Sequence, residues 1–374
     1  MRITGGRVFD PEDGFAVRDV CTNGARIAPD SGDDTVLDAG GCWVIPGLID
    51  LHFHGCAGED FSDASPDGLQ KIADFELSRG VAYICPAAMT LPEERLTAVC
   101  QNAAAHRKRG AGGAELAGIY LEGPFLSPAK KGAQNAAYLR APDPALLERL
   151  QEASGGCVRL VALAPELPGS LELIKAAGEL GITVSVGHTA AGYDTARAAF
   201  EAGAAQVTHL FNAMPPLAHR EPGPVGAAFE LPHVRAELIC DGVHIHPAAV
   251  RAAFRLFGRE RIILISDSMR ASGMPDGSYT LGGQTVIVKG PLCTLEDGAT
   301  IAGSATSLMS CMKTAVSFGI PLADAVRACT CNPARAIGID GRAGTLETGK
   351  EASIVLLNEG DLSVRCIVFK GRVV

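Results

Sequence analysis

Histidines and acidic residues stand directly after short apolar runs at several separated places in this sequence. The set consists of His52, His54, Glu122, His188, His209, Asp241, His244 and Asp267. Imidazole nitrogens and carboxylate oxygens are the donors that a borderline divalent cation such as Zn²⁺ takes in proteins, and such a site can leave positions open for water. If the fold gathers these side chains, the sequence predicts a metal centre.

Spacing and polarity single out three of these residues. His52 and His54 are two positions apart, so on a strand both imidazoles point to the same side. Glu122 ends an apolar run, where an unpaired carboxylate would be costly to bury. A cation would supply the missing partner of this carboxylate.

Asp267 follows the apolar run 262–265. A carboxylate beside a metal site can take a proton from water and return it to a leaving amine, which makes Asp267 the candidate catalytic residue. A helix N-cap in front of Ser268 is the structural alternative.

The elements that must position these residues can be read from alternating apolar runs and Ala-rich amphipathic stretches, a pattern typical of βα units. Strands are expected at 48–54, 81–86, 116–122, 158–164, 183–188, 206–209, 236–241 and 262–267, and helices at 69–79, 93–108, 171–180, 194–202, 248–257, 308–318 and 322–330. The pattern predicts an α/β protein with a (β/α)8 TIM barrel, with a doubly wound open sheet as the alternative. In a barrel the ionisable residues lie at the C-terminal strand ends, where the βα loops form one mouth.

Both ends of the chain have a different pattern, of short β-like pieces separated by turn residues. The expected strands are 2–4, 7–9, 17–22, 26–28 and 43–45 near the N-terminus, and 352–357, 364–369 and 372–374 near the C-terminus. We therefore expect residues 1–46 and 341–374 to form one small β domain, and residues 47–340 to form the barrel. Alternating Thr and Val between glycines predicts a β-hairpin insertion near 277–297.

Composition excludes several classes of protein. With 33 Lys and Arg against 42 Asp and Glu, the net charge of −9 argues against a broad surface for nucleic acid or an anionic membrane. No apolar run reaches the length of a membrane span, and the first residues lack the apolar region of a signal peptide, so we expect a cytoplasmic protein. The 12 cysteines are scattered without metal-binding spacing and are expected to be buried thiols.

Several longer motifs in the sequence resemble those of a known family. The motifs are PGLIDLHFHG (46–55), YLEGPFLSPAKKGA (120–133), LAPE (163–166), VGHTAA (186–191), THLFNAMPPLAHREPGPVGAA (208–228), DGVHIHP (241–247), LISDSM (264–269), AGS (302–304) and NPARAIG (332–338). In these blocks, over about residues 40–355, the chain resembles the N-acetylglucosamine-6-phosphate deacetylases of the amidohydrolase superfamily. The resemblance implies a barrel with a small β-sandwich built from both termini. It also implies hydrolysis of N-acetylglucosamine 6-phosphate to glucosamine 6-phosphate and acetate.

Roles of individual residues are also implied by this resemblance. Glu122, His188 and His209 match the family's metal ligands, and His52 and His54 match ligands of a second ion in members that keep this pair. One or two divalent ions are therefore expected, Zn²⁺ in the first place and Fe²⁺ as an alternative. Asp267 matches the catalytic acid and base, and the positions that match substrate contacts are Ala133, Gln134, Asn212, Ala213, Arg220, His244, Ile301, Ala302 and Gly303.

Two of the matched positions have further consequences. Arg220 matches the arginine that binds the sugar phosphate, which in the family comes from the neighbouring subunit, so a homodimer with shared sites is expected. Gln134 stands where the family usually has histidine, and its amide forms hydrogen bonds but does not gain a proton near neutral pH. We expect this departure to alter substrate preference or rate.

Two other functions remain open at this point. One is a related amidohydrolase acting on another N-acyl amino sugar or on a cyclic amide; the dihydroorotase type uses a carboxylated lysine on its fourth strand, and 158–166 contains no lysine. The other is a sugar-phosphate binding protein without catalysis, which the presence of Asp267 and of every matched ligand disfavours.

Overall fold

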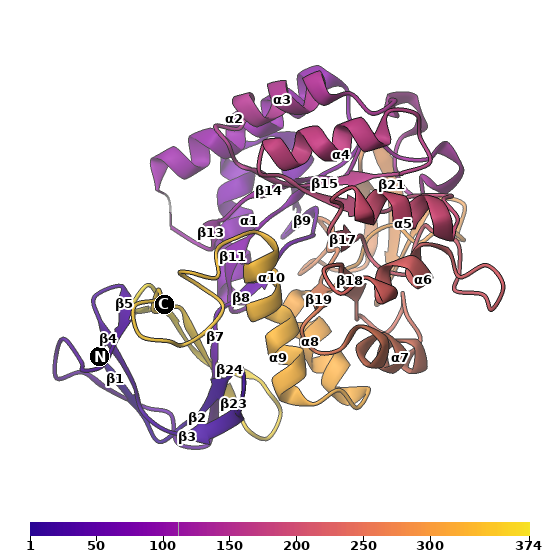
Figure 1. The fold of residues 1–374 in the computed structure, drawn as a ribbon. Coiled ribbons are helices and arrows are strands. Elements are labelled where there is room, and N and C mark those ends of the chain that lie inside the picture. Colours follow the sequence, from indigo (N-terminus) through magenta and orange to yellow (C-terminus); the bar gives the residue numbers. More distant parts are fainter. Residues whose placement is uncertain (111) are drawn as a thin grey trace.

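A closed barrel of parallel strands forms the body of the molecule in the computed structural model, which describes residues 1–110 and 112–374 (Figure 1). Hydrogen bonds between the segments that directly follow the first and last strands close the ring: Asp267 N–H donates to the His52 carbonyl at 2.9 Å, and His54 N–H donates to the Ser268 carbonyl at 2.7 Å. The barrel strands are β8 (Leu48–Asp50), β11 (Val81–Ile84) with β12 (Ala87–Ala88), β14 (Ile119–Leu121), β15 (Val158–Leu163), β16 (Thr183–Val186), β17 (Gln206–Val207), β18 (Arg235–Ile239) and β19 (Ile262–Ile265). The predicted TIM barrel is confirmed, and the open sheet is excluded.

Helices surround this barrel. They are α1 (Pro66–Ser78), α2 (Glu93–Arg109), α3 (Pro144–Ala153), α4 (Ser170–Glu179), α5 (Tyr193–Glu201), α6 (Gly223–Glu230), α7 (Pro247–Phe257), α8 (Leu308–Ser317), α9 (Leu322–Cys329) and α10 (Cys331–Ala336), with 3₁₀ turns at Phe61–Asp63, Pro128–Lys130 and Ala136–Tyr138. The local sequence determines where α1, α3 and α8 begin, because the side chains of Ser65, Asp143 and Ser307 each accept a backbone N–H in the first turn of the helix. None of the described helices combines the length and the apolar character needed to cross a bilayer.

Three of these helices were not expected from the sequence. Helix α3 had a readable signal, because Asp143 caps it, a proline follows, and buried leucines recur along one face. Helix α6 begins with Gly-Pro and is buried almost all round, so it shows neither a helix-forming start nor an amphipathic period. Helix α10 has only six residues and contains Pro333.

Residues near both termini pair in two further sheets. β23 (Ile354–Asn358) is antiparallel to β7 (Cys42–Pro46), and the six-stranded sheet runs β25-β24-β23-β7-β2-β3, with β24 (Val364–Phe369), β25 (Arg372–Val373), β2 (Arg7–Asp10) and β3 (Gly14–Val17). A four-stranded sheet runs β5-β4-β1-β6, with β5 (Arg26–Ala28), β4 (Val20–Asn23), β1 (Arg2–Thr4) and β6 (Val36–Asp38). The division at residues 46 and 341 stays a prediction.

The expected strand at 17–22 was wrong, because Arg18 and Asp19 interrupt it and separate β3 from β4. The short, mostly exposed strand β6 was missed. Of the 12 cysteines, all unpaired, ten are buried, as expected of small core thiols.

The inserted segment after β19 is a three-stranded meander rather than a hairpin. It consists of β20 (Gly277–Leu281), β21 (Gln284–Lys289) and β22 (Leu292–Leu295), and the Gly290-Pro291 turn adds the third strand. Leu281, Val286 and Cys293 pack with Met89 and Met269 in a small core of their own. The meander thus forms a wall next to the C-terminal strand ends.

Ion pairs join the barrel to residues of the C-terminal segment 342–370, away from the C-terminal ends of the barrel strands. Glu115, in β13 (Glu115–Leu116) beside β11, lies 2.5 Å from both Arg342 Nη2 and Lys370 Nζ. Arg342 also bonds Glu351, which accepts a hydrogen bond from Tyr83 Oη at 2.9 Å. Burial acts to raise the pKa of Glu115, but Arg342 and Lys370 outweigh it and hold this pKa below its usual value.

Replacing Glu115 by glutamine should lower the free energy of unfolding by about 1–2 kcal/mol near neutral pH, because two cations lose their carboxylate. Since the folded pKa is lowered, this contribution is complete above the unfolded pKa of about 4.3 and is lost as the pH falls through the folded pKa. Urea unfolding at pH 7 and below pH 4 measures the difference, with Lys71→Gln in an exposed pair as the control. Equal stability of wild type and Glu115→Gln at pH 7 would contradict the assignment.

Candidate active site

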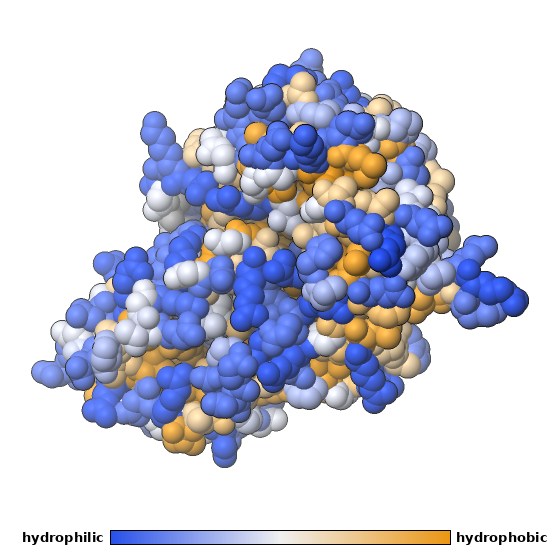
Figure 2. Space-filling model, viewed as in Figure 1, coloured by the Kyte–Doolittle hydropathy of each residue, from blue (hydrophilic) through white to orange (hydrophobic). Residues whose placement is uncertain are grey.

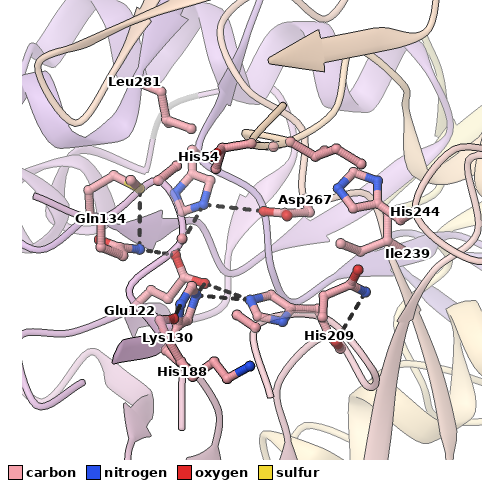
Figure 3. Close-up of a pocket in the computed structure, with 18 of the residues that line it drawn as sticks. His54, Glu122, Lys130, Gln134, His188, His209, Ile239, His244, Asp267 and Leu281 are labelled. Atoms are coloured by element: carbon pink, nitrogen blue, oxygen red, sulfur yellow. Dashed lines mark hydrogen bonds and ion pairs between the residues drawn. The ribbon is translucent and has the colours of Figure 1, made fainter. Parts of the chain in front are cut away.

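A cavity of about 420 Å³ opens at the C-terminal ends of the barrel strands (Figure 3). Residues from nearly every strand end reach it, together with Leu281 from the inserted meander. The predicted site residues that line it are His54, Glu122, Ala133, Gln134, His188, His209, Asn212, Ala213, His244, Asp267, Ile301 and Gly303. The fold therefore brings together positions that are scattered along the sequence.

Glu122 is the centre of a cluster of imidazoles. Its Oε1 atom lies 3.1 Å from Nε2 of both His188 and His209 and 3.2 Å from Nε2 of His52. Its Oε2 atom lies 3.3 Å from Nε2 of His54. Within this cluster, His52, His54 and Glu122 form one group of potential metal donors, and Glu122, His188 and His209 form a second.

Hydrogen bonds on the outer side of the rings orient three of these histidines. Nδ1 lies 2.9 Å from a carboxylate oxygen of Glu237 in His52, 3.1 Å from the Ala87 carbonyl in His54, and 2.9 Å from the Lys130 carbonyl in His188. These partners accept hydrogen bonds, so Nδ1 carries the proton. Each Nε2 atom is then directed toward the cluster and is free to act as a metal donor once it has lost its proton.

Backbone geometry at the strand ends is unusual. His188, His209 and Asp267 have positive φ angles of 45°, 28° and 46°, a region that residues other than glycine seldom adopt. Such conformations persist where surrounding structure holds them, and they gather at functional sites. The turns of the chain after the strands thus direct these side chains into the cavity.

Charges in the cluster depend on one another. Burial acts to lower the pKa of His54, but Asp267 and Glu122 outweigh it and raise the pKa to about 10. Burial acts to raise the pKa of Glu122, while His52 and the other histidines bring it well below its usual value. The pKa of Asp267 is lowered as well, because His54 and His52 outweigh burial. The buried carboxylates therefore require positive charge beside them.

A divalent cation fits this donor set. His52 Nε2 and Asp267 Oδ1 are buried, and neither makes a well-directed hydrogen bond to a described residue. Imidazole nitrogens around a carboxylate, with a further carboxylate at one side, are the donor chemistry of catalytic metal sites, and a bound cation would replace the ring protons as the positive charge. The arrangement can hold a divalent ion and place water beside Asp267.

His244 lies across the cavity from His54 and near Asp267 (Figure 3). Its Nδ1 atom is 2.8 Å from Asp241 Oδ2, and Asp241 Oδ1 accepts the backbone N–H groups of Val243 and His244. Burial acts to lower the pKa of His244, but Asp241 outweighs it and raises this pKa. Asp241 thereby fixes the imidazole orientation and favours its protonated form.

Gln134 is buried and both ends of its amide are bonded within the protein. Oε1 accepts the Thr90 N–H at 2.7 Å, and Nε2 donates to Glu122 Oε2 at 2.5 Å. The residue lines the cavity, yet its amide is directed toward the metal-site carboxylate. Its predicted substrate contact stays a prediction.

Three predicted site residues do not line the cavity of their own chain. His52 is buried beneath it, and Ala302 is buried in the core of the meander. Arg220 lies on a loop between β17 and α6 that projects from the barrel, where residues 216–221 are exposed (Figure 1). Figure 2 shows that the tip of this loop is hydrophilic and stands clear of the molecular body.

Sequence reasoning missed Glu237, Thr90 and Glu166. Glu237 accepts from His52, and Glu166 accepts the Thr189 hydroxyl and the Ala190 N–H next to His188. A signal existed for Glu237, because it is the one charged residue inside the buried part of an otherwise apolar strand. A carboxylate there requires a partner in the barrel interior.

Comparisons with known proteins agree with the geometry. The model of the amidohydrolase family matches residues 43–374. An N-acetylgalactosamine-6-phosphate deacetylase of Escherichia coli O157:H7 is 40% identical over 88% of this chain and 87% of its own length. An N-acetylglucosamine-6-phosphate deacetylase of Bos taurus is 37% identical over 100% of this chain and 90% of its own. The crystal structure of N-acetyl-D-glucosamine-6-phosphate deacetylase from Mycobacterium smegmatis superposes with a TM-score of 0.93 at 35% identity, covering 100% of both chains.

Replacing Gln134 by methionine, which is similar in volume, should reduce the free energy of unfolding of metal-free protein by roughly 2–4 kcal/mol. The reason is that the Thr90 N–H and the Glu122 carboxylate both lose a partner while they remain buried. Guanidinium unfolding measures the loss. Gln70→Met removes an amide at the surface and should cost under about 1 kcal/mol; an equal loss in both variants would refute the role given to the Gln134 amide.

Proposed function

Because the chain belongs to the amidohydrolase family, we propose that it hydrolyses N-acetyl-D-glucosamine 6-phosphate to D-glucosamine 6-phosphate and acetate. The observation that supports this most directly is the convergence of four imidazoles and Glu122 beside Asp267, three of the imidazoles lining one cavity and His52 lying directly beneath it. The acetamide and the phosphate of the proposed substrate are inferred from the substrates for which the similar enzymes are named.

Glu122, His188 and His209 would hold one divalent cation, and His52 and His54 with Glu122 would hold a second. We propose Zn²⁺, with Fe²⁺ as the alternative, because both suit imidazole with carboxylate. The chemistry supplied by a cation in this place is Lewis acidity, which lowers the pKa of water and polarises the acetamide carbonyl.

Asp267 carries the proton in this proposal. Asp267 lines the cavity, with Oδ1 3.2 Å from His54 Nε2, so its carboxylate is placed to accept a proton from the attacking water. The same carboxyl group then protonates the departing amine. His244, held by Asp241, would donate a hydrogen bond to the substrate from the other side of the cavity.

Substrate contacts account for the rest of the site. Ala133, Asn212, Ala213, Ile301 and Gly303 line the cavity and would surround the sugar. Gln134 lines the same cavity with its amide directed to Glu122, and Ala302 would act from behind this lining.

Arg220 would bind the phosphate from the partner subunit of a homodimer, because in its own chain it lies on the projecting loop. Its bidentate guanidinium suits a phosphate, and remote binding of this kind orients the reacting amide. We also propose a cytoplasmic location. A charged sugar phosphate does not cross a bilayer unaided, so the enzyme has to be in the compartment in which this substrate is formed.

The galacto epimer is a second candidate substrate. The Escherichia coli relative, at 40% identity, is named for N-acetylgalactosamine 6-phosphate. The two sugars share the acetamide and the phosphate, so the reaction would be the same.

Replacing Asp267 by asparagine should lower kcat for N-acetylglucosamine 6-phosphate by about 10²–10⁴-fold, because the amide cannot take the proton. Primary amine release is measured with metal-quantified protein. The substrates are both phosphorylated epimers and unphosphorylated N-acetylglucosamine, and the last should react at least about 100-fold more slowly in kcat/KM. Metal-loaded wild type without activity on any of them would sink the proposal, and activity only on the galacto epimer would move it to that sugar.

Arg220 can be assigned to one subunit or the other by mixing two inactive proteins. Co-expressed Arg220→Ala and Asp267→Asn chains with different tags should recover about a quarter of wild-type activity if Arg220 acts across the interface, since half the dimers then hold one intact site. Arg220→Lys keeps the charge without the bidentate fork and should raise KM in the homodimer. No recovery in purified mixed dimers would place Arg220 in its own subunit's site or outside both.

A further inference from the structure

Glu237 is a carboxylate buried in the barrel floor under the metal-site histidines. It belongs to β18 and is completely inaccessible to solvent. Its hydrogen-bond partners are His52 Nδ1 at 2.9 Å, Gln206 Nε2 at 2.5 Å and the His209 N–H at 3.1 Å. No described lysine or arginine forms an ion pair with it, so the neighbouring donors have to compensate its charge.

Its bond to His52 differs from those of the other oriented histidines. His54 and His188 direct Nδ1 to neutral backbone carbonyls, whereas His52 directs Nδ1 to a carboxylate. Hydrogen bonds to an ionised acceptor are shorter and about twice as strong as neutral ones. They fix the ring more firmly and increase the basicity of its other nitrogen.

Its bond to His209 reaches the second group of donors. The His209 N–H belongs to a residue with a positive φ of 28°, and Glu237 Oε2 accepts it together with the His52 ring proton. One carboxylate oxygen thus contacts a residue from each donor group. Gln206, buried on the adjacent strand β17, holds the other oxygen in place.

We propose that Glu237 is a positioning residue for the metal centre, which sets the ring orientation and basicity of His52 and holds the His209 backbone at a fixed distance from it. This inference rests on the proposed metal site and adds a determinant outside the ligands. Its function is to keep the two donor groups in register around Glu122. A buried charge with a merely structural role would contribute to stability without affecting cation binding.

The test is the affinity for Zn²⁺ and Co²⁺, measured on the full chain by competition with a chromophoric chelator, with bound metal counted by elemental analysis. Glu237→Gln keeps the shape of the side chain, and the partnerless Gln206 Oε1 can receive the new N–H after its amide turns. We expect Zn²⁺ affinity to fall about 10-fold or more, as for other changes behind metal ligands. The visible spectrum of the Co²⁺ protein should also change, because a neutral amide oxygen in place of the carboxylate makes His52 a weaker donor to the ion.

Two comparisons separate positioning from stability. Glu115→Gln removes another ionised and ion-paired carboxylate, away from the site, and should leave Zn²⁺ affinity at the wild-type value. In a His52→Asn background the effect of Glu237→Gln should shrink to under about threefold, because its main route is absent. An unchanged Zn²⁺ affinity in Glu237→Gln, or an equal loss with and without His52, overturns the inference.

If Glu237→Gln does not fold, Glu237→Asp replaces it, since the charge stays but the carboxylate is withdrawn from His52. A loss of about fivefold or more in Zn²⁺ affinity supports the inference, and wild-type affinity overturns it. Sugar deacetylation by the wild type is measured separately. Weaker Zn²⁺ binding in the variant with no wild-type deacetylation would remove the proposed function and keep the positioning role.

Discussion

The burial of the Glu122 carboxylate is the constraint on which the rest of the site depends. A lone ionised carboxylate in a barrel interior would be prohibitive, so the surroundings must deliver positive charge or strong donors to it. Four imidazoles from β-strand ends and the Gln134 amide do so. These groups come from four separate parts of the chain, and the barrel fold brings them to within about 3 Å of the two Glu122 oxygen atoms.

The precision of this cluster comes from acceptors on the outer side of the histidine rings. Carbonyls of Ala87 and Lys130 and the Glu237 carboxylate hold the outer ring nitrogens. Asp241 holds His244 in the same manner. Rigid strands therefore set the positions, while loops and the inserted meander close the cavity around them. This division separates metal binding, which requires fixed geometry, from substrate choice, which depends on the walls.

Sequence patterns predicted the barrel and the convergence of its ionisable residues, because buried parallel strands read as short apolar runs and strand ends meet at one face. They did not predict α6, which is buried on most sides and begins with turn-forming residues. They also did not reveal the direction of the Gln134 amide, since bonds to Thr90 and Glu122 arise between segments that only the folded chain brings together. Glu237 could have been noticed as a charge in an apolar strand, but its partner could not have been named.

Pairing between β7 and β23 has a consequence for folding during synthesis on the ribosome. Arg7 and Glu359 form an ion pair although they are 352 residues apart in the chain. β7 pairs with β2 along one edge, but its other edge has a partner only when β23 has been made. On the ribosome, therefore, the N-terminal strands leave the exit tunnel long before their partners, and the six-stranded sheet is completed after synthesis of the whole barrel sequence. Until then, one edge of β7 has unpaired backbone groups beside apolar side chains, and it can pair with a strand of another chain.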